Sequence, residues 1–432
     1  MTMKRIAMTS AVLACLGAVA MPEIENLSVS QNRDRMVSIS FSLTEKAIVT
    51  MDILTNGVSI GADNYQTLRE PLSPKDEFPA GKPLAAGEHV WMWRPTKEWP
   101  GYHFDNNAFS VKVQAWSFDA PPDYMVVDGV AQSNITFYAS AAELPYGGIK
   151  TADPEDEEAV SALSSDVYRT TKIIMRKIPA AGVKWRMGSP EDEPYRIADE
   201  IPHYVTLTND YYVSIYPVTF HQSKVFFNLS ENLLVKPKFN MSYTNARGST
   251  TTDYIWPDDG HAVAASSPFA YMRRRTGIEI DFLTEAEWEY ACRAGTEGRW
   301  NHDGDTPTEV AWTDYTGDGK HHFVGLKKPN RWGLYDMHGL VQEWVLDQYG
   351  PYPDGAVIAP EGVSTNVTKR ILRGGPKAYR PTSSSSYSNS PKYATRSAYR
   401  ASDNWSSAND GNNNGYGVRL SCPAALPDWM RQ

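Results

Sequence analysis

Residues 330–344 read NRWGLYDMHGLVQEW, and this short stretch holds the features around which the rest of the chain can be organised. Its two acids, Asp336 and Glu343, lie seven positions apart, and the run between them is nearly uncharged. A carboxylate in apolar surroundings needs a partner, because burying it alone is costly. Gly339 can adopt backbone angles that other residues resist. The stretch therefore predicts a loop that turns at Gly339 and directs both acids towards a common partner.

Calcium is one partner that would satisfy such a loop, because Ca2+ takes carboxylate and backbone carbonyl oxygens together. The predicted site uses the side chains of Asp336 and Glu343 and the carbonyl oxygens of Met337, Gly339 and Val341. The alternative is that Asp336 caps a turn and Glu343 makes a surface ion pair. The spacing of the two acids alone is compatible with both.

Several motifs in the second half of the chain carry a resemblance to a known family. GLYDMHGLVQEW (333–344) is similar to the signature of the formylglycine-generating enzyme, or sulfatase-modifying factor, family. The other similar segments, in chain order, are WRMGSPEDE (185–193), FLTEAEWEYACRAGT (282–296), RILRGG (370–375), RSAYR (396–400) and GVRL (417–420). The resemblance covers about residues 170–422 and implies an α+β domain with a C-type-lectin-like fold.

The N-terminus predicts a signal peptide over residues 1–20. Lys4 and Arg5 precede an apolar run, and Ala18-Val19-Ala20 is a cleavage site of the A-x-A type. The run is too short to span a membrane, so we expect a secreted, periplasmic or otherwise extracytoplasmic protein without a transmembrane segment. A net charge of −9 leaves no basic footprint for nucleic acid.

A length of 432 residues favours two or more domains. Residues 21–137 contain short β-rich runs separated by turn signals, which predict an all-β, immunoglobulin-like sandwich. Residues 138–168 include the acidic segment ADPEDEEAV and are expected to form a linker. Residues 169–432 are expected to form the sulfatase-modifying-factor-like domain.

Residues 284–295 predict the clearest helix, because Thr284 and Glu287 form a capping box. Cys292 shares the apolar face of this helix with Trp288, which favours a structural role over that of a nucleophile. Cys422 is the other cysteine that remains after removal of residues 1–20. An oxidising compartment would allow the two thiols to pair, and unpaired buried thiols are the alternative.

Residues 301–330 are rich in acids and loops, and the resemblance implies a second calcium ion here, for which we assign no ligands. His321 and His322 are adjacent, so in a regular strand they would point to opposite faces and would not chelate one ion together. We expect both to be solvated loop residues.

The family's aerobic oxidases, as the resemblance implies, hold Cu(I) with two cysteines, and soft thiolates suit that ion. The interval that would contain those cysteines, residues 376–395, has none, and no cysteine occurs between Arg293 and Ser421. We therefore do not expect copper, and the sequence argues against formylglycine-forming oxidase activity.

The same C-terminal segment is rich in Tyr, Ser and Asn, a composition typical of antibody-type binding surfaces. The predicted ligand-binding residues are Tyr379, Tyr387, Tyr393, Asn404, Trp405 and Asn409. A plain polar loop is the alternative. We expect the protein to bind an extracytoplasmic protein or glycan, and the rival hypothesis is a family oxidase that acts on a sulfatase cysteine.

Overall fold

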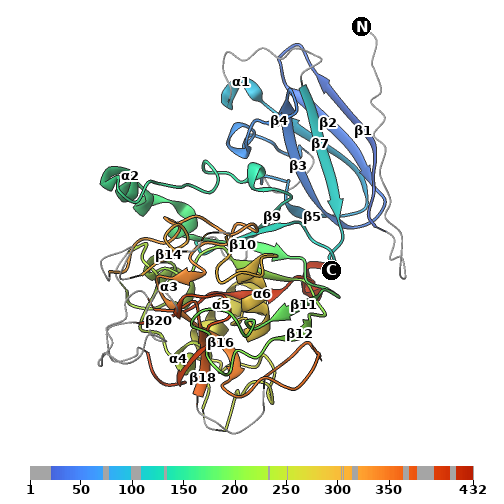
Figure 1. Ribbon diagram of the computed structural model, residues 1–432. Coiled ribbons are helices and arrows are strands. Elements are labelled where there is room, and N and C mark those ends of the chain that lie inside the picture. Colours follow the sequence, from blue (N-terminus) through green and yellow to red (C-terminus); the bar gives the residue numbers. More distant parts are fainter. Residues whose placement is uncertain are drawn as a thin grey trace. The chain divides into compact units, whose positions relative to one another are not determined.

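The computed structural model divides the chain into two compact units, and each is described by itself (Figure 1). Unit 1 comprises Met1–Tyr124, Thr136–Ile149 and Ala425–Gln432, and unit 2 comprises Met125–Ile135 and Lys150–Ala424. The structure describes residues 21–71, 77–98, 109–130, 134–231, 234–250, 252–302, 304, 306–313, 320–362, 369–376, 394–408 and 415–431.

Unit 1 contains two antiparallel sheets that share one apolar core. One sheet has the order β1-β2-β6, and in the other β3 pairs with β4, β5 and β7. The strands are β1 (Ile24–Gln31), β2 (Val37–Leu43), β3 (Ala47–Thr55), β4 (Val58–Ser59), β5 (Lys82–Leu84), β6 (Gly87–Trp93) and β7 (Phe109–Trp116). In β2, buried and partly exposed residues alternate along VSISFSL, as expected for a strand with one face on a core.

The core of unit 1 is dominated by aromatic and β-branched side chains. Trp91 and Trp93 on β6 are fully buried, and Phe41 on β2 packs edge-on against Trp91 with ring centroids 5.0 Å apart. The short helices of this unit are η1 (Ala62–Asn64), α1 (Pro95–Glu98), η2 (Ala141–Glu143) and α8 (Asp428–Arg431). The β-rich runs of the sequence thus form the strands that were predicted from them.

Unit 2 mixes helices with several small sheets. One sheet has the order β21-β13-β10-β8-β9, another β11-β12-β17, a third β19-β18-β16-β20, and β14 pairs with β15. The strands are β8 (Tyr124–Asp128), β9 (Asn134–Tyr138), β10 (Lys172–Ile178), β11 (Lys184–Met187), β12 (His203–Thr206), β13 (Tyr211–Ser214), β14 (Ala311–Trp312), β15 (His338–Gly339), β16 (Gln342–Gln348), β17 (Val357–Ile358), β18 (Lys369–Arg373), β19 (Ala401–Asn404), β20 (Tyr416–Gly417) and β21 (Ser421–Pro423). The boundary between the units falls within β9, because Thr136–Tyr138 are counted in unit 1.

Strand β16 is buried along its whole length, and it pairs antiparallel with β18 and parallel with β20. It begins inside the quoted stretch and ends at Gln348, five residues beyond Glu343. Because both faces of β16 are covered, its polar residues must find partners within the protein.

The helices of unit 2 are α2 (Glu157–Ala162), η3 (Leu163–Ser165), η4 (Val167–Arg169), α3 (Phe220–Phe227), α4 (Tyr243–Arg247), α5 (Pro268–Thr276) and α6 (Glu285–Arg293). The capping box of α6 is present: Thr284 accepts the N–H of Glu287, and the Glu287 side chain accepts the N–H of Thr284. The helix ends at Ala294, which adopts a left-handed conformation. The predicted helix is therefore confirmed.

Part of the predicted linker belongs to the interior of unit 2. Asp166 and Arg169 are fully buried and form an ion pair, and Tyr168 between them is buried as well. Among the helices within the described ranges, none is both long and apolar enough to cross a membrane.

Candidate functional site

The predicted calcium loop turns at Gly339, as the sequence indicates. Gly339 has a φ of +75°, and a Cβ at this position would lie 2.1 Å from the carbonyl oxygen of Trp312. This close approach follows from the parallel pairing of Trp312 with Gly339 between β14 and β15. Only glycine satisfies both the backbone angle and the space.

Glu343 is held in a buried hydrogen-bonded ion pair with Arg419. Arg419 Nε donates to Oε1 at 3.0 Å and to Oε2 at 2.9 Å, and Nε1 of Trp288 donates to Oε2 at 2.7 Å. Glu343 and Arg419 are both fully buried. The suggestion of a surface ion pair at Glu343 is therefore wrong in its location, because β16 is covered on both faces.

Asp336 has one oxygen in use and one open. Its Oδ2 accepts the N–H of Gly325 at 2.7 Å, whereas the buried Oδ1 has no hydrogen-bond partner in the described part of the chain. Burial raises the pKa of Asp336 to about 6, and the hydrogen bond from Gly325 opposes that shift. An open, buried carboxylate oxygen is what a bound cation would satisfy.

The five predicted calcium ligands do not fit together as one set. The carbonyl oxygens of Met337 and Val341 lie 3.7 and 3.4 Å from the position that a Cβ would take on Gly374, so the loop does bring them to the same place. The Gly339 carbonyl accepts the N–H of Val341 at 2.7 Å.

The misfit lies in the side chains. Both oxygens of Glu343 are occupied by Arg419, and a cation beside that guanidinium would meet a like charge. Within the described ranges no cluster of three or more His, Cys, Asp or Glu residues could hold a metal ion. Calcium binding thus stays a prediction: Asp336 has an open oxygen, whereas both oxygens of Glu343 are taken by Arg419.

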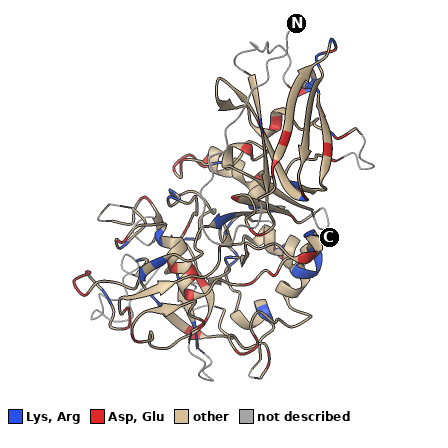
Figure 2. Ribbon diagram, turned by 90° about the vertical axis from the view of Figure 1, so that its right-hand side faces the viewer, with Lys and Arg blue, Asp and Glu red and all other residues tan. Residues whose placement is uncertain are grey.

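The motif acids and arginines pair with one another inside unit 2, where Figure 2 shows acidic and basic residues on neighbouring segments. Three further buried pairs are Arg373 with Glu289, Arg396 with Glu200 and Arg400 with Glu285. Each pair joins segments that are far apart in the sequence. These pairs, together with Arg419 and Glu343, therefore connect most of the motifs that carry the resemblance.

Cys292 lies in the core beside His338. Its Sγ is 3.6 Å from Nε2 of His338, and Nδ1 of that ring is 2.7 Å from the carbonyl oxygen of Thr395. Burial raises the pKa of Cys292 to about 12 and lowers that of His338 to about 4. At neutral pH both groups are uncharged, so this pair does not form the thiolate that a cysteine nucleophile requires.

Cys422 lies on β21 opposite Tyr212 of β13. It is buried, it is not in a disulfide, and desolvation alone raises its pKa. Cys292 is equally buried and free. Of the two alternatives for the thiols, the structure has unpaired buried cysteines.

His321 and His322 stack on different aromatic rings, and His321 is not solvated. The ring of His321 stacks on Phe239 with centroids 3.9 Å apart and is buried, and that of His322 stacks on Trp312 at 3.8 Å. The expectation of solvated residues is wrong for His321 because Phe239 offers its ring a flat apolar partner.

The predicted ligand-binding surface falls mostly outside the described residues, which do not include Tyr379, Tyr387, Tyr393 and Asn409. Asn404, at the end of β19, is exposed, and its Oδ1 accepts from the N–H and hydroxyl of Ser406.

Trp405 is only 7% exposed, and the guanidinium of Arg370 lies 5.4 Å from its ring centroid. The expected exposure of Trp405 is therefore wrong, because its ring covers a buried arginine. This contact makes Trp405 part of the packing of unit 2.

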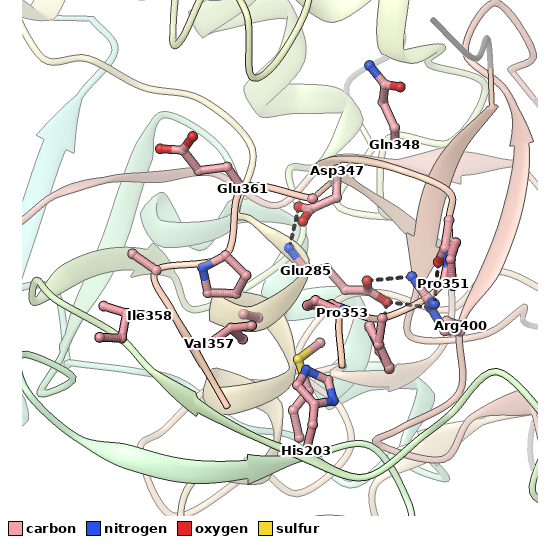
Figure 3. A pocket seen from close by; sticks show the side chains of 17 residues that line it. His203, Glu285, Asp347, Gln348, Pro351, Pro353, Val357, Ile358, Glu361 and Arg400 are labelled. Carbon is pink, nitrogen blue, oxygen red and sulfur yellow. Dashed lines mark hydrogen bonds and ion pairs between the residues drawn. The ribbon is translucent and has the colours of Figure 1, made fainter. Parts of the chain in front are cut away.

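Sequence reasoning missed a cavity of about 400 Å3 at the N-terminal end of α6 (Figure 3). Asp347, Glu285, Arg400 and His203 line it, together with apolar residues of the segment 351–360. Asp347 is 3% exposed, and its Oδ2 accepts the N–H of Glu285, the first residue of α6, at 2.6 Å. Desolvation and the nearby Glu285 raise the pKa of Asp347 to about 8.

A signal for this cavity was available in the sequence. Asp347 follows Glu343 at a spacing of four with three apolar residues between them, and the segment from Pro351 to Pro360 is rich in proline and aliphatic residues. The β12–β17 pairing that closes one wall joins residues about 150 positions apart, and no local pattern indicates it.

Unit 2 is a mixed helix-and-sheet domain, and charged residues of the quoted motifs form ion pairs in its interior. Residues 176–421 match the family model described as "Sulfatase-modifying factor enzyme 1-like domain". This match covers more than half of the chain, and the chain belongs to that family.

A formylglycine-generating enzyme of Streptomyces coelicolor is 34% identical over an alignment of 108 positions, and the match covers 21% of this chain and 34% of that relative. The chain thus spans about a third of the length of this curated relative. Among solved structures, PvdO from Pseudomonas aeruginosa is 22% identical with a TM-score of 0.46, and the match covers 58% of this chain and 94% of that chain. Treponema denticola variable protein 1 is 20% identical with a TM-score of 0.43, and the match covers 58% of this chain and 95% of that chain.

Proposed function

We propose that this protein is an exported member of the family that works by binding a ligand and has lost the cysteine-dependent oxidase chemistry. The observation that carries the proposal is the position of its thiols. No cysteine occurs between Arg293 and Ser421, and the two that flank this interval, Cys292 and Cys422, are buried in the core.

A Cu(I) site of the family's type needs two accessible thiolates, and neither thiol supplies one. Burial keeps both protonated at neutral pH, since it raises both pKa values. Cys292 is further enclosed by His338 and by the carbonyl oxygen of Met337, 3.9 Å from its Sγ. The rival hypothesis, a formylglycine-generating oxidase, would have to proceed without the ligands that its copper requires.

The ligand-binding part of the proposal rests on composition. Six of the eight residues 383–390 are serine, and tyrosines and asparagines flank them, which suits a surface that binds a protein or a glycan. Export rests on residues 1–20. We also infer a C-type-lectin-like fold for unit 2 and an immunoglobulin-like topology for unit 1; the mixed sheets of the former and the two sheets of the latter support these inferences.

The proposal is tested by measuring copper content and oxidase activity in one preparation. The purified protein, loaded with Cu(I), is incubated with a sulfatase-derived cysteine peptide, and the aldehyde product is quantified by mass spectrometry. The Streptomyces coelicolor formylglycine-generating enzyme serves as the positive control. We expect no stoichiometric copper and no aldehyde. Conversion of the peptide, lost on Cys292→Ala, would restore the oxidase hypothesis.

A further inference from the structure

We propose that the cavity beside α6 binds an organic cation, an ammonium or guanidinium group on an apolar stem, with Asp347 as its counter-ion. The inference concerns a site distinct from the C-terminal surface and from the two thiols. It holds or fails independently of the proposed loss of oxidase chemistry.

Asp347 presents an open oxygen to the cavity. Its Oδ2 accepts the N–H of Glu285, whereas its Oδ1 accepts no hydrogen bond from the described residues, and the residue as a whole is almost entirely buried. Figure 3 shows Asp347 on the opposite side of the cavity from His203. A ligand that donates N–H to this oxygen would add a charge-assisted hydrogen bond that the free protein lacks.

The balance of charge around the cavity favours a cation. Glu285 is matched by Arg400, which donates to its two oxygens at 2.9 and 2.8 Å. Asp347 and the exposed Glu361 are the other two acids of the lining, and no ion pair involves either of them in the described chain. The lining therefore carries two acids beyond the matched pair, and a cationic ligand complements them once Asp347 has given up its proton.

The walls suit an apolar stem. Pro351, Pro353, Val357, Ile358 and Pro360 contribute aliphatic surface, and Ile358 is 73% exposed. A volume of about 400 Å3 lies in the range of small-ligand sites.

The side of the cavity near α6 is rigid, which keeps Asp347 in position. The hydroxyl of Tyr352 donates to Glu285 at 3.1 Å, and the guanidinium of Arg400 lies 4.0 Å from the Tyr352 ring centroid. The ring of His203 packs on Tyr352 at 4.5 Å, with Nδ1 2.9 Å from the carbonyl oxygen of Ile201. These contacts fix the wall before any ligand arrives.

Binding should release a proton. Glu285 and Glu287 from α6 raise the pKa of Asp347, Arg400 lowers it, and burial dominates. Glu361, Arg370, Tyr352 and His203 are the remaining titratable groups around it. With a pKa of about 8, Asp347 is mostly protonated at pH 7. An incoming ammonium ion favours the carboxylate, so the acid gives its proton to solvent and an ion pair replaces the O–H.

The experiment is titration calorimetry of the full chain with n-hexylammonium, n-butylguanidinium and the neutral analogue 1-hexanol, at pH 7 in two buffers of different ionisation enthalpy. We expect both cations to bind and to release close to one proton each, and 1-hexanol to bind roughly tenfold or more weakly. A lysine-containing tripeptide with blocked ends forms a second arm. Its binding would point to a peptide side chain as the source of the cation, and binding of the free cations alone would point to a small molecule.

Asp347→Asn is the decisive variant, because the amide keeps an acceptor for the Glu285 N–H and removes the charge. It should weaken cation binding about tenfold or more and abolish proton release. A melting curve confirms that the variant is folded, and 1-hexanol binding provides a second check on the cavity. Equal affinities for cation and alcohol, absence of proton release, or full cation binding by Asp347→Asn would each overturn the proposal.

Discussion

Arg419 and Glu343 form a hydrogen-bonded ion pair in the interior of unit 2, with both side chains fully buried. Arg419 also donates to the carbonyl oxygens of Ser214 and Tyr335, at 2.9 and 2.8 Å. One guanidinium thus joins β16, β13 and the loop before β15. This relationship explains how a motif acid can resemble a metal ligand and yet serve the packing of the fold.

The first prediction concerns the cost of breaking this pair. Glu343→Gln removes the negative charge and leaves Arg419 buried without a counter-ion. We expect a loss of about 3–5 kcal/mol in the free energy of unfolding of unit 2. Chemical denaturation, followed by the fluorescence of its buried tryptophans, measures the effect.

The matched control is the exposed pair of Lys328 and Glu309 in the same unit, where the side chains are 70% and 57% exposed. Glu309→Gln should leave the denaturation midpoint unchanged within error, because solvent screens exposed pairs. If the two variants behaved alike, the buried pairs would not be what holds the motifs together.

The second prediction concerns the thiols. Protein expressed without residues 1–20, and so without Cys15, should show no reaction of Cys292 or Cys422 with an aromatic disulfide reagent at pH 8 in the native state, and two equivalents after unfolding, because both thiols are buried and protonated. Cys292→Ala should remove one of these equivalents. Rapid reaction of one thiol in the folded protein would contradict the prediction, because that thiol would then be accessible to the reagent.

The third prediction concerns calcium. If Asp336 Oδ1 holds a cation, Ca2+ should raise the melting temperature of the protein by mass action and a chelator should lower it. Asp336→Ala should abolish the difference. A melting temperature that is the same with calcium and with chelator would contradict calcium binding at Asp336.

The features that could be predicted are those that depend on residues close together in the sequence. The strands of unit 1 follow from β-rich runs, the helix α6 from the Thr284–Glu287 capping box, and the turn from Gly339. The sequence did not predict the pairing of Arg419 with Glu343 or of Arg396 with Glu200, since such pairs join residues 76 and 196 positions apart. Burial of polar residues is set by those distant contacts, so Glu343 was expected to bind a metal where the structure pairs it with Arg419.

The fourth prediction corrects the role of Trp405. Because its ring covers Arg370 in the interior, Trp405→Ala should lower the stability of unit 2 by about 3–5 kcal/mol, the range for buried aromatic truncations. Asn404→Ala, at an exposed neighbouring position, is the control and should leave stability nearly unchanged. A folded, fully stable Trp405→Ala protein would instead favour the surface role first expected from the sequence.

The last prediction concerns the pH dependence of stability. The pKa of Asp347 is about 8 in the folded state and 3.8 in the unfolded chain, so between about pH 4 and 8 the native state holds a proton that the unfolded state lacks. The stability that this proton provides is fully present below pH 4 and is lost as the pH rises through 8. Asp347→Asn should therefore become more stable relative to wild type by about 1 kcal/mol per pH unit between pH 5 and 7.

Val357→Ala, which alters the same cavity without adding or removing a titratable group, should keep the wild-type slope. Denaturation curves at pH 5, 6, 7 and 8 provide the measurement, and parallel slopes for wild type and Asp347→Asn would show that Asp347 is ionised in the folded protein, with its open oxygen satisfied by solvent.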